Sequence, residues 1–115
     1  MVKWVTHFVW GAIAAFVVLG CQAYSPDLLG RVALATIIGD IISHFRGRRF
    51  SYHDFAIMAT HMAVFYTMPL VGILVGVTHI ALDKASKGWF DVASFVFLML
   101  GLLVVGITLR YVCWV

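Results

Sequence analysis

The chain has 115 residues, of which 63% are hydrophobic and 11% are charged, and its formal net charge is +3. A soluble domain has roughly 45–50% apolar and about 25% charged residues, so this chain has too little polar surface to cover itself in water. The composition therefore excludes an ordinary soluble domain. It predicts an all-α, polytopic integral membrane bundle that forms a single transmembrane domain over residues 1–115.

Four apolar stretches predict four transmembrane helices, in chain order at about 4–24, 28–44, 55–80 and 89–109. After the first, Ser25-Pro26-Asp27 predicts a turn and a new helix start, because proline cannot continue the preceding helix and Ser or Asp can cap the next. The third stretch contains Pro69, at which we expect a kink. Beyond it, Gly72 and Gly76 have the G-x-x-x-G spacing that lets another helix approach closely.

Basic residues indicate the orientation of these four helices. Arg46, Arg48 and Arg49 form the only dense basic cluster, which we interpret as a topology signal that marks a cytoplasmic loop, with a lipid-headgroup patch as the alternative. Four crossings put both termini on the side of this loop, so we expect both in the cytoplasm, in a bacterial inner membrane. No aromatic-basic pattern indicates nucleic-acid binding.

The two cysteines, Cys21 and Cys113, are far apart and form no C-x-x-C pair. The sequence therefore indicates neither a redox motif nor a thiolate zinc site. We expect both to be small buried or lipid-facing residues.

Titratable side chains are costly in hydrocarbon, so those inside the apolar stretches indicate a polar site. With a rise of 1.5 Å per residue, His7, Asp40 and His61 lie about 5, 6 and 9 Å inside the same end of the bundle, with His44 at the rim. Imidazole and carboxylate groups suit a divalent metal such as zinc. The favoured interpretation is nevertheless a hydrogen-bond network that holds the bundle together, with a metal site, a proton relay and haem ligation as the alternatives.

A second polar cluster, of His79, Asp83 and Asp91, is expected at the opposite side of the membrane. His61 and His79 are about 27 Å apart along a straight helix. They cannot bind the same ion unless the region around Pro69 folds back. We therefore interpret the two aspartates as interfacial or capping residues.

The chain resembles a family of short phage and bacterial membrane proteins in the order of three motifs: Gly39-Asp40, His61 and Thr78-His79-x-x-x-Asp83. It departs from that family at Thr36, where the family has a histidine. With Thr6-His7-x-x-x-Gly11 added, the pattern also resembles the membrane-bound metal-dependent hydrolase family. That second resemblance implies that His7, Asp40, His61, His79 and Asp83 form the polar signature. The family's contiguous H-R-G-x-T-H block is absent from this chain.

No G-x-S-x-G elbow, Walker loop, H-E-x-x-H motif or glutamate is present, so only Asp and His remain as general bases. The favoured hypothesis is therefore a structural or accessory membrane component, not an enzyme, whose partners are the bilayer and either further copies of itself or a larger membrane complex. The alternatives are a metal-dependent membrane hydrolase that uses the His/Asp site and a proton or ion pathway.

Overall fold

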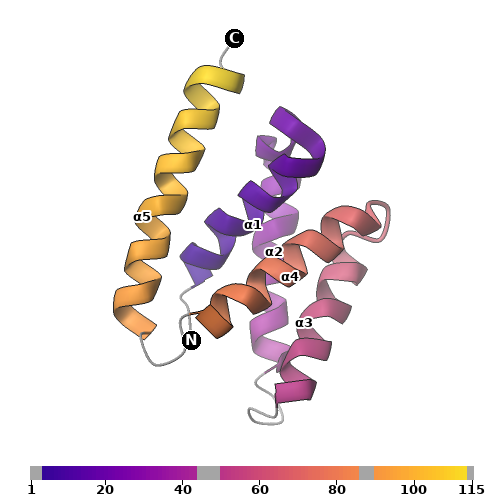
Figure 1. Ribbon diagram of the computed structural model, residues 1–115. Helices are drawn as coiled ribbons and strands as arrows, with labels where there is room; N and C mark the ends of the chain where they lie inside the picture. Colours follow the sequence, from indigo (N-terminus) through magenta and orange to yellow (C-terminus); the bar gives the residue numbers. More distant parts are fainter. Residues whose placement is uncertain (1–3, 44–49, 86–89, 114–115) are drawn as a thin grey trace.

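The structure, a computed structural model, describes residues 4–43, 50–85 and 90–113, without the side chains of residues 43, 50–53, 90 and 91. The described residues form helices and no strands, which confirms the expected all-α fold (Figure 1). In chain order the elements are α1 (Trp4–Leu19), the 3₁₀ helix η1 (Gly20–Tyr24), α2 (Pro26–Ser43), α3 (Phe50–Val64), α4 (Pro69–Ala85), α5 (Phe90–Thr108) and the π-helix η2 (Leu109–Cys113).

The first two helices are joined by a tight connection at the predicted position. Gly20 has φ of +63°, a left-handed conformation that glycine adopts without strain, and it begins the 3₁₀ turn that ends α1. Ser25 then caps α2, because its Oγ accepts a hydrogen bond of 3.4 Å from the backbone N–H of Leu28. Pro26 occupies the first helical position, where its missing N–H costs nothing.

The single helix expected over 55–80 is instead an antiparallel pair, α3 and α4, joined by residues 65–68. Pro69 begins α4 and does not kink a continuous helix. Backbone hydrogen bonds hold the turn: Phe65 N–H donates to the His61 carbonyl (3.0 Å) and Met68 N–H donates to the Phe65 carbonyl (2.8 Å). Gly72, packed against α3, leaves the space in which the two helices approach each other.

Helices α1 and α5 run side by side in the same direction (Figure 1). Near their starts, Thr6 Oγ1 lies 3.0 Å from Ser94 Oγ, and the Trp10 indole N–H donates to the Phe97 carbonyl (2.8 Å). The start of α1 and the end of η2 therefore lie at opposite ends of this pair. That arrangement does not agree with the expectation that both termini share one side, which assumed an even number of antiparallel crossings.

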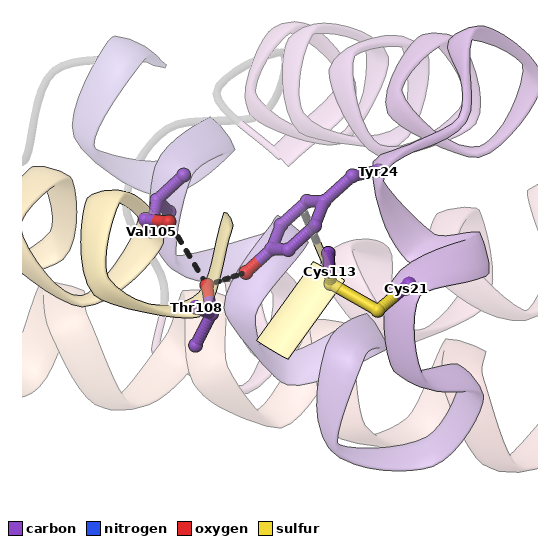
Figure 2. The surroundings of a disulfide bond; sticks show 5 residues. All are labelled: Cys21, Tyr24, Val105, Thr108 and Cys113. Atoms are coloured by element: carbon purple, nitrogen blue, oxygen red, sulfur yellow. Dashed lines mark hydrogen bonds between the residues drawn. A yellow bond between two sulfur atoms is a disulfide. The ribbon is translucent and has the colours of Figure 1, made fainter. Parts of the chain in front are cut away.

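The far ends of α1 and α5 are joined covalently. Cys21 and Cys113 form a disulfide, with their Cα atoms 5.5 Å apart, so they are not the unpaired small residues that the sequence suggested. Beside the disulfide, the hydroxyls of Tyr24 and Thr108 lie 2.9 Å apart, and Thr108 Oγ1 donates to the Val105 carbonyl (Figure 2). Contacts at both ends therefore fix the register of α5 on α1.

By length and composition, two of the described helical segments could cross a membrane, Trp4–Tyr24 and Val92–Cys113. The other described helices do not meet the same test, so four spans are not established. A core of mostly small side chains lies between the helices and allows their close packing; its buried members are Ala14, Ala15, Ala23, Val32, Ala35, Phe65, Val71 and Val75.

Candidate metal centre

Four titratable side chains from three helices meet near one end of the bundle. His7 comes from α1, Asp40 from α2, and His79 and Asp83 from the second half of α4. Each offers one ligand atom, and these four atoms all lie within 4.8 Å of one another. A set of two imidazoles and two carboxylates at this spacing suits a divalent cation such as Zn²⁺, Mn²⁺ or Fe²⁺.

Direct contacts link the four groups. His7 Nε2 lies 3.0 Å from Asp83 Oδ1, and His79 Nε2 lies 2.9 Å from Asp40 Oδ1. His79 Nε2 is also 3.7 Å from the second carboxylate oxygen of Asp83, one helical turn away. The rings of His7 and His79 stack with their centroids 3.6 Å apart. Each imidazole therefore faces a carboxylate from another helix.

Gly11, one turn after His7, explains why α1 can bring its histidine to this point. A Cβ atom at Gly11 would stand 2.7 Å from Val32 Cγ1 of α2 and 3.3 Å from Val75 Cγ1 of α4. Only a residue without a side chain lets α1 lie this close to both helices. The spacing Thr6-His7-x-x-x-Gly11 thus has a packing role, and the hydrogen bonds of Thr6 to Ser94 fix the start of α1 on α5.

The cluster is buried, with one partly open side. The side chains of His7, Asp40 and His79 are at most 2% exposed, and that of Asp83 is 16% exposed. Nδ1 of His7 and Nδ1 of His79 are buried and have no hydrogen-bond partner among the described residues. A buried polar atom without a partner costs about 1–3 kcal/mol, so the side chains that the structure describes do not complete this network. The four converging ligand atoms fit a site that holds an ion, and each unpartnered nitrogen suits a hydrogen bond with water.

The structure groups the predicted site residues differently from the sequence analysis. His7 and Asp40 were predicted to share a site, and they meet His79 and Asp83, which were expected on the opposite side. His61 lies next to this group, with its ring edge against His79 (centroids 5.5 Å apart), but it is not one of the four. His44 and the cluster Arg46, Arg48 and Arg49 lie outside the described residues, as does the side chain of Asp91.

A scan against protein-family models finds no match for this chain, and searches of curated proteins and of solved structures find no similar protein either. The interpretation of the site therefore depends on its residues and their geometry.

A repeated dipeptide in the sequence accompanies this grouping. The dipeptide Thr-His occurs three times, at Thr6-His7, Thr60-His61 and Thr78-His79, and all three histidines are at or beside the cluster. The hydroxyls of Thr60 and Thr78 donate hydrogen bonds to the backbone carbonyls four residues earlier, so each polar group has a partner inside an apolar helix. The turn before Pro69 brings His61 and His79 together, and His7 of α1 stacks on His79.

Proposed function

We propose that this protein is a small membrane metalloprotein that holds one divalent cation between His7, Asp40, His79 and Asp83. The observation that carries the proposal is the convergence of four ligand atoms, from three helices, within 4.8 Å. Four protein ligands satisfy a tetrahedral Zn²⁺, whereas Mn²⁺ or Fe²⁺ accept further ligands and keep positions for water or substrate.

With an ion such as Mn²⁺ or Fe²⁺, which would keep positions for water, metal-dependent hydrolysis is the activity that such a site supports best. A bound divalent cation lowers the pKa of water and polarises an ester or phosphoryl oxygen. Hydrolysis adds the water oxygen to the carbonyl carbon or phosphorus, and a proton goes to the departing oxygen. Asp83, the most exposed of the four side chains, is where a substrate would approach. The resemblance to membrane-bound metal-dependent hydrolases agrees with this chemistry, and a lipid or another substrate at the membrane surface is the substrate class that we propose.

A membrane location is supported by the two long apolar segments and by the surface of α5. Large apolar side chains cover the face of α5 that turns away from α1, and Val92, Phe95 and Leu103 are 62%, 62% and 59% exposed. Such a continuous apolar face is costly in water and suits lipid. Helices α1 and α5 would cross the bilayer in parallel, which puts the start of α1 and the end of η2 on opposite sides.

Charge and redox chemistry support one direction for this crossing. In the sequence, six of the eight basic residues come just before α1 or at and after the ends of α2 and α4, the helix ends that carry the His/Asp cluster; they are Lys3, Arg46, Arg48, Arg49, Lys84 and Lys87. An excess of Lys and Arg favours the cytoplasmic side. The disulfide is at the other end and suits an oxidising compartment. We therefore propose that the cluster faces the cytoplasm and that the end of η2 faces the exterior.

A structural role is the second candidate, because the four groups also contact one another without an ion. The His7–Asp83 and His79–Asp40 contacts of 3.0 and 2.9 Å tie α1 to α4 and α4 to α2. In this case the cluster holds together an accessory component that assembles in the membrane.

Metal analysis of protein purified in detergent separates the two candidates. We expect about one divalent ion per chain in the wild type and a loss of at least tenfold in affinity in Asp40→Ala, since a direct ligand contributes at least as much as a second-shell group. Asp54→Ala is the matched control, because Asp54 pairs with Lys84 (3.4 Å) and is not among the four. A metal-free wild type with an intact fold would refute the metal site and favour the structural role.

A further inference from the structure

His61 is a buried imidazole with one nitrogen occupied and one unused. Its Nδ1 lies 2.7 Å from the carbonyl oxygen of Ile57, one turn earlier in α3. A carbonyl oxygen only accepts hydrogen bonds, so Nδ1 carries the proton and donates it. In the neutral ring, Nε2 is then left with a lone pair. Nε2 is fully buried and has no hydrogen-bond partner among the described residues.

Two glycines lie against His61 beside the His/Asp cluster. A Cβ atom at Gly39 would stand 3.8 Å from His61 Cε1, the carbon between the two ring nitrogens, and one at Gly76 would stand 3.4 Å from His61 Cβ. Gly39 directly precedes Asp40, and Gly76 lies one turn before His79. The outer edge of the ring therefore reaches α2 beside one member of the cluster, while its contact with His79 joins it to another.

In metal sites a histidine typically donates one ring N–H to a backbone carbonyl, which orients the ring and leaves the lone pair of the other nitrogen directed at the site. His61 has this orientation, yet it is not one of the four groups whose ligand atoms converge. Leaving its buried lone pair unused would cost about 1–3 kcal/mol. The arrangement thus suits an acceptor for a small polar molecule held in the cluster.

We infer that His61 Nε2 accepts a hydrogen bond from the water or substrate N–H or O–H group that binds in the site, and so orients it. This inference rests on the proposed metal site. It gives His61 a role different from that of a metal ligand.

Two substitutions separate an acceptor from a ring that merely fills space. His61→Gln keeps a polar amide group near the position of Nε2, whereas His61→Asn keeps one only near Nδ1. Each protein is loaded with Co²⁺ and titrated with acetohydroxamate, a small probe with N–H and O–H donors, and binding is followed by the visible cobalt spectrum. Cobalt stoichiometry and far-ultraviolet circular dichroism of each variant check that the site and the fold are retained.

We expect stoichiometric cobalt in all three proteins. The affinity for acetohydroxamate should be close to that of the wild type in His61→Gln. It should be about tenfold weaker in His61→Asn, because that variant loses one hydrogen bond to the probe. Equal affinities in all three proteins, or an equal loss in both variants, overturn the role of His61 and leave the metal site standing. A wild type that takes up no cobalt overturns both proposals.

Discussion

Replacing Gly72 by alanine tests the α3–α4 hairpin on which the site depends, because the neighbours of the new methyl group cannot move aside. A Cβ atom there would stand 3.0 Å from the His61 carbonyl oxygen and 3.2 Å from Phe65 Cβ. The first neighbour is backbone, and the second belongs to a fully buried side chain. Gly76, one turn later, is the matched control: its new Cβ would stand 2.7 Å from Met58 Sδ, near the end of a flexible side chain that can rotate away.

The two substitutions should change the stability of the protein by different amounts. Overpacking costs about 1–3 kcal/mol, and exchanging glycine for alanine inside a helix returns about 1 kcal/mol. Because its nearest neighbour is backbone, Gly72→Ala should lose about 1–2 kcal/mol of stability, the upper half of the difference, and Gly76→Ala should be close to neutral or slightly stabilised. For a chain of this size, 1 kcal/mol corresponds to a shift of about 4 °C in the midpoint of thermal unfolding.

Thermal unfolding in detergent, followed by circular dichroism at a helical wavelength, measures the difference. We expect Gly72→Ala to unfold about 4–8 °C below the wild type, with Gly76→Ala within about 2 °C of it. If the two variants unfold at the same temperature, or if Gly76→Ala is the less stable, α3 and α4 do not pack as described and the convergence of His61 with His79 is refuted.

Three further predictions concern the site, the disulfide and the orientation. Because imidazole and carboxylate must be unprotonated to bind a metal, lowering the pH from 7 to 5 should weaken metal affinity at least tenfold in a dialysis assay; unchanged affinity would contradict ligation by His7 and His79. Unfolded wild type should take up no maleimide until it is reduced and two per chain afterwards, measured by mass spectrometry, and labelling before reduction would contradict the Cys21–Cys113 bond. Proteolysis of tags on intact cells should remove one placed after residue 115 and spare one placed before residue 1; cleavage of both or neither would refute the parallel crossing of α1 and α5.

Much of the helical architecture followed from local sequence. The cap at Ser25, the helix start at Pro26 and the end of the first helical segment at Tyr24 agree with the prediction, because caps and prolines act on their own neighbours. The long stretch at 55–80 was misread for the same reason. Hydrophobicity continues across residues 65–68, so it gave no sign of a turn, and Pro69 is as compatible with a helix start as with a kink.

The site was predictable in its residue types but not in its grouping. His7 and Asp40 were assigned to one end from depth alone, and the structure brings them together. Depth along a straight helix put His79 and Asp83 at the opposite end, and the reversal of the chain before Pro69 changes that assignment. The pairing of Cys21 with Cys113 was not visible either, because it follows from the parallel direction of α1 and α5, a tertiary property.

The disulfide also bears on which ion the proposed metal site would select. Thiolates are soft ligands that attract Cu(I) and zinc strongly, and both cysteines of this chain are joined to each other, at the end opposite the His/Asp cluster. In the oxidised protein, ion selection at the proposed site would therefore be left to imidazole and carboxylate, which together suit divalent ions such as Zn²⁺, Mn²⁺ or Fe²⁺. Purification in a reducing buffer would release two sulfurs as a competing soft site, so a metal inventory taken that way would describe a different protein from the oxidised one.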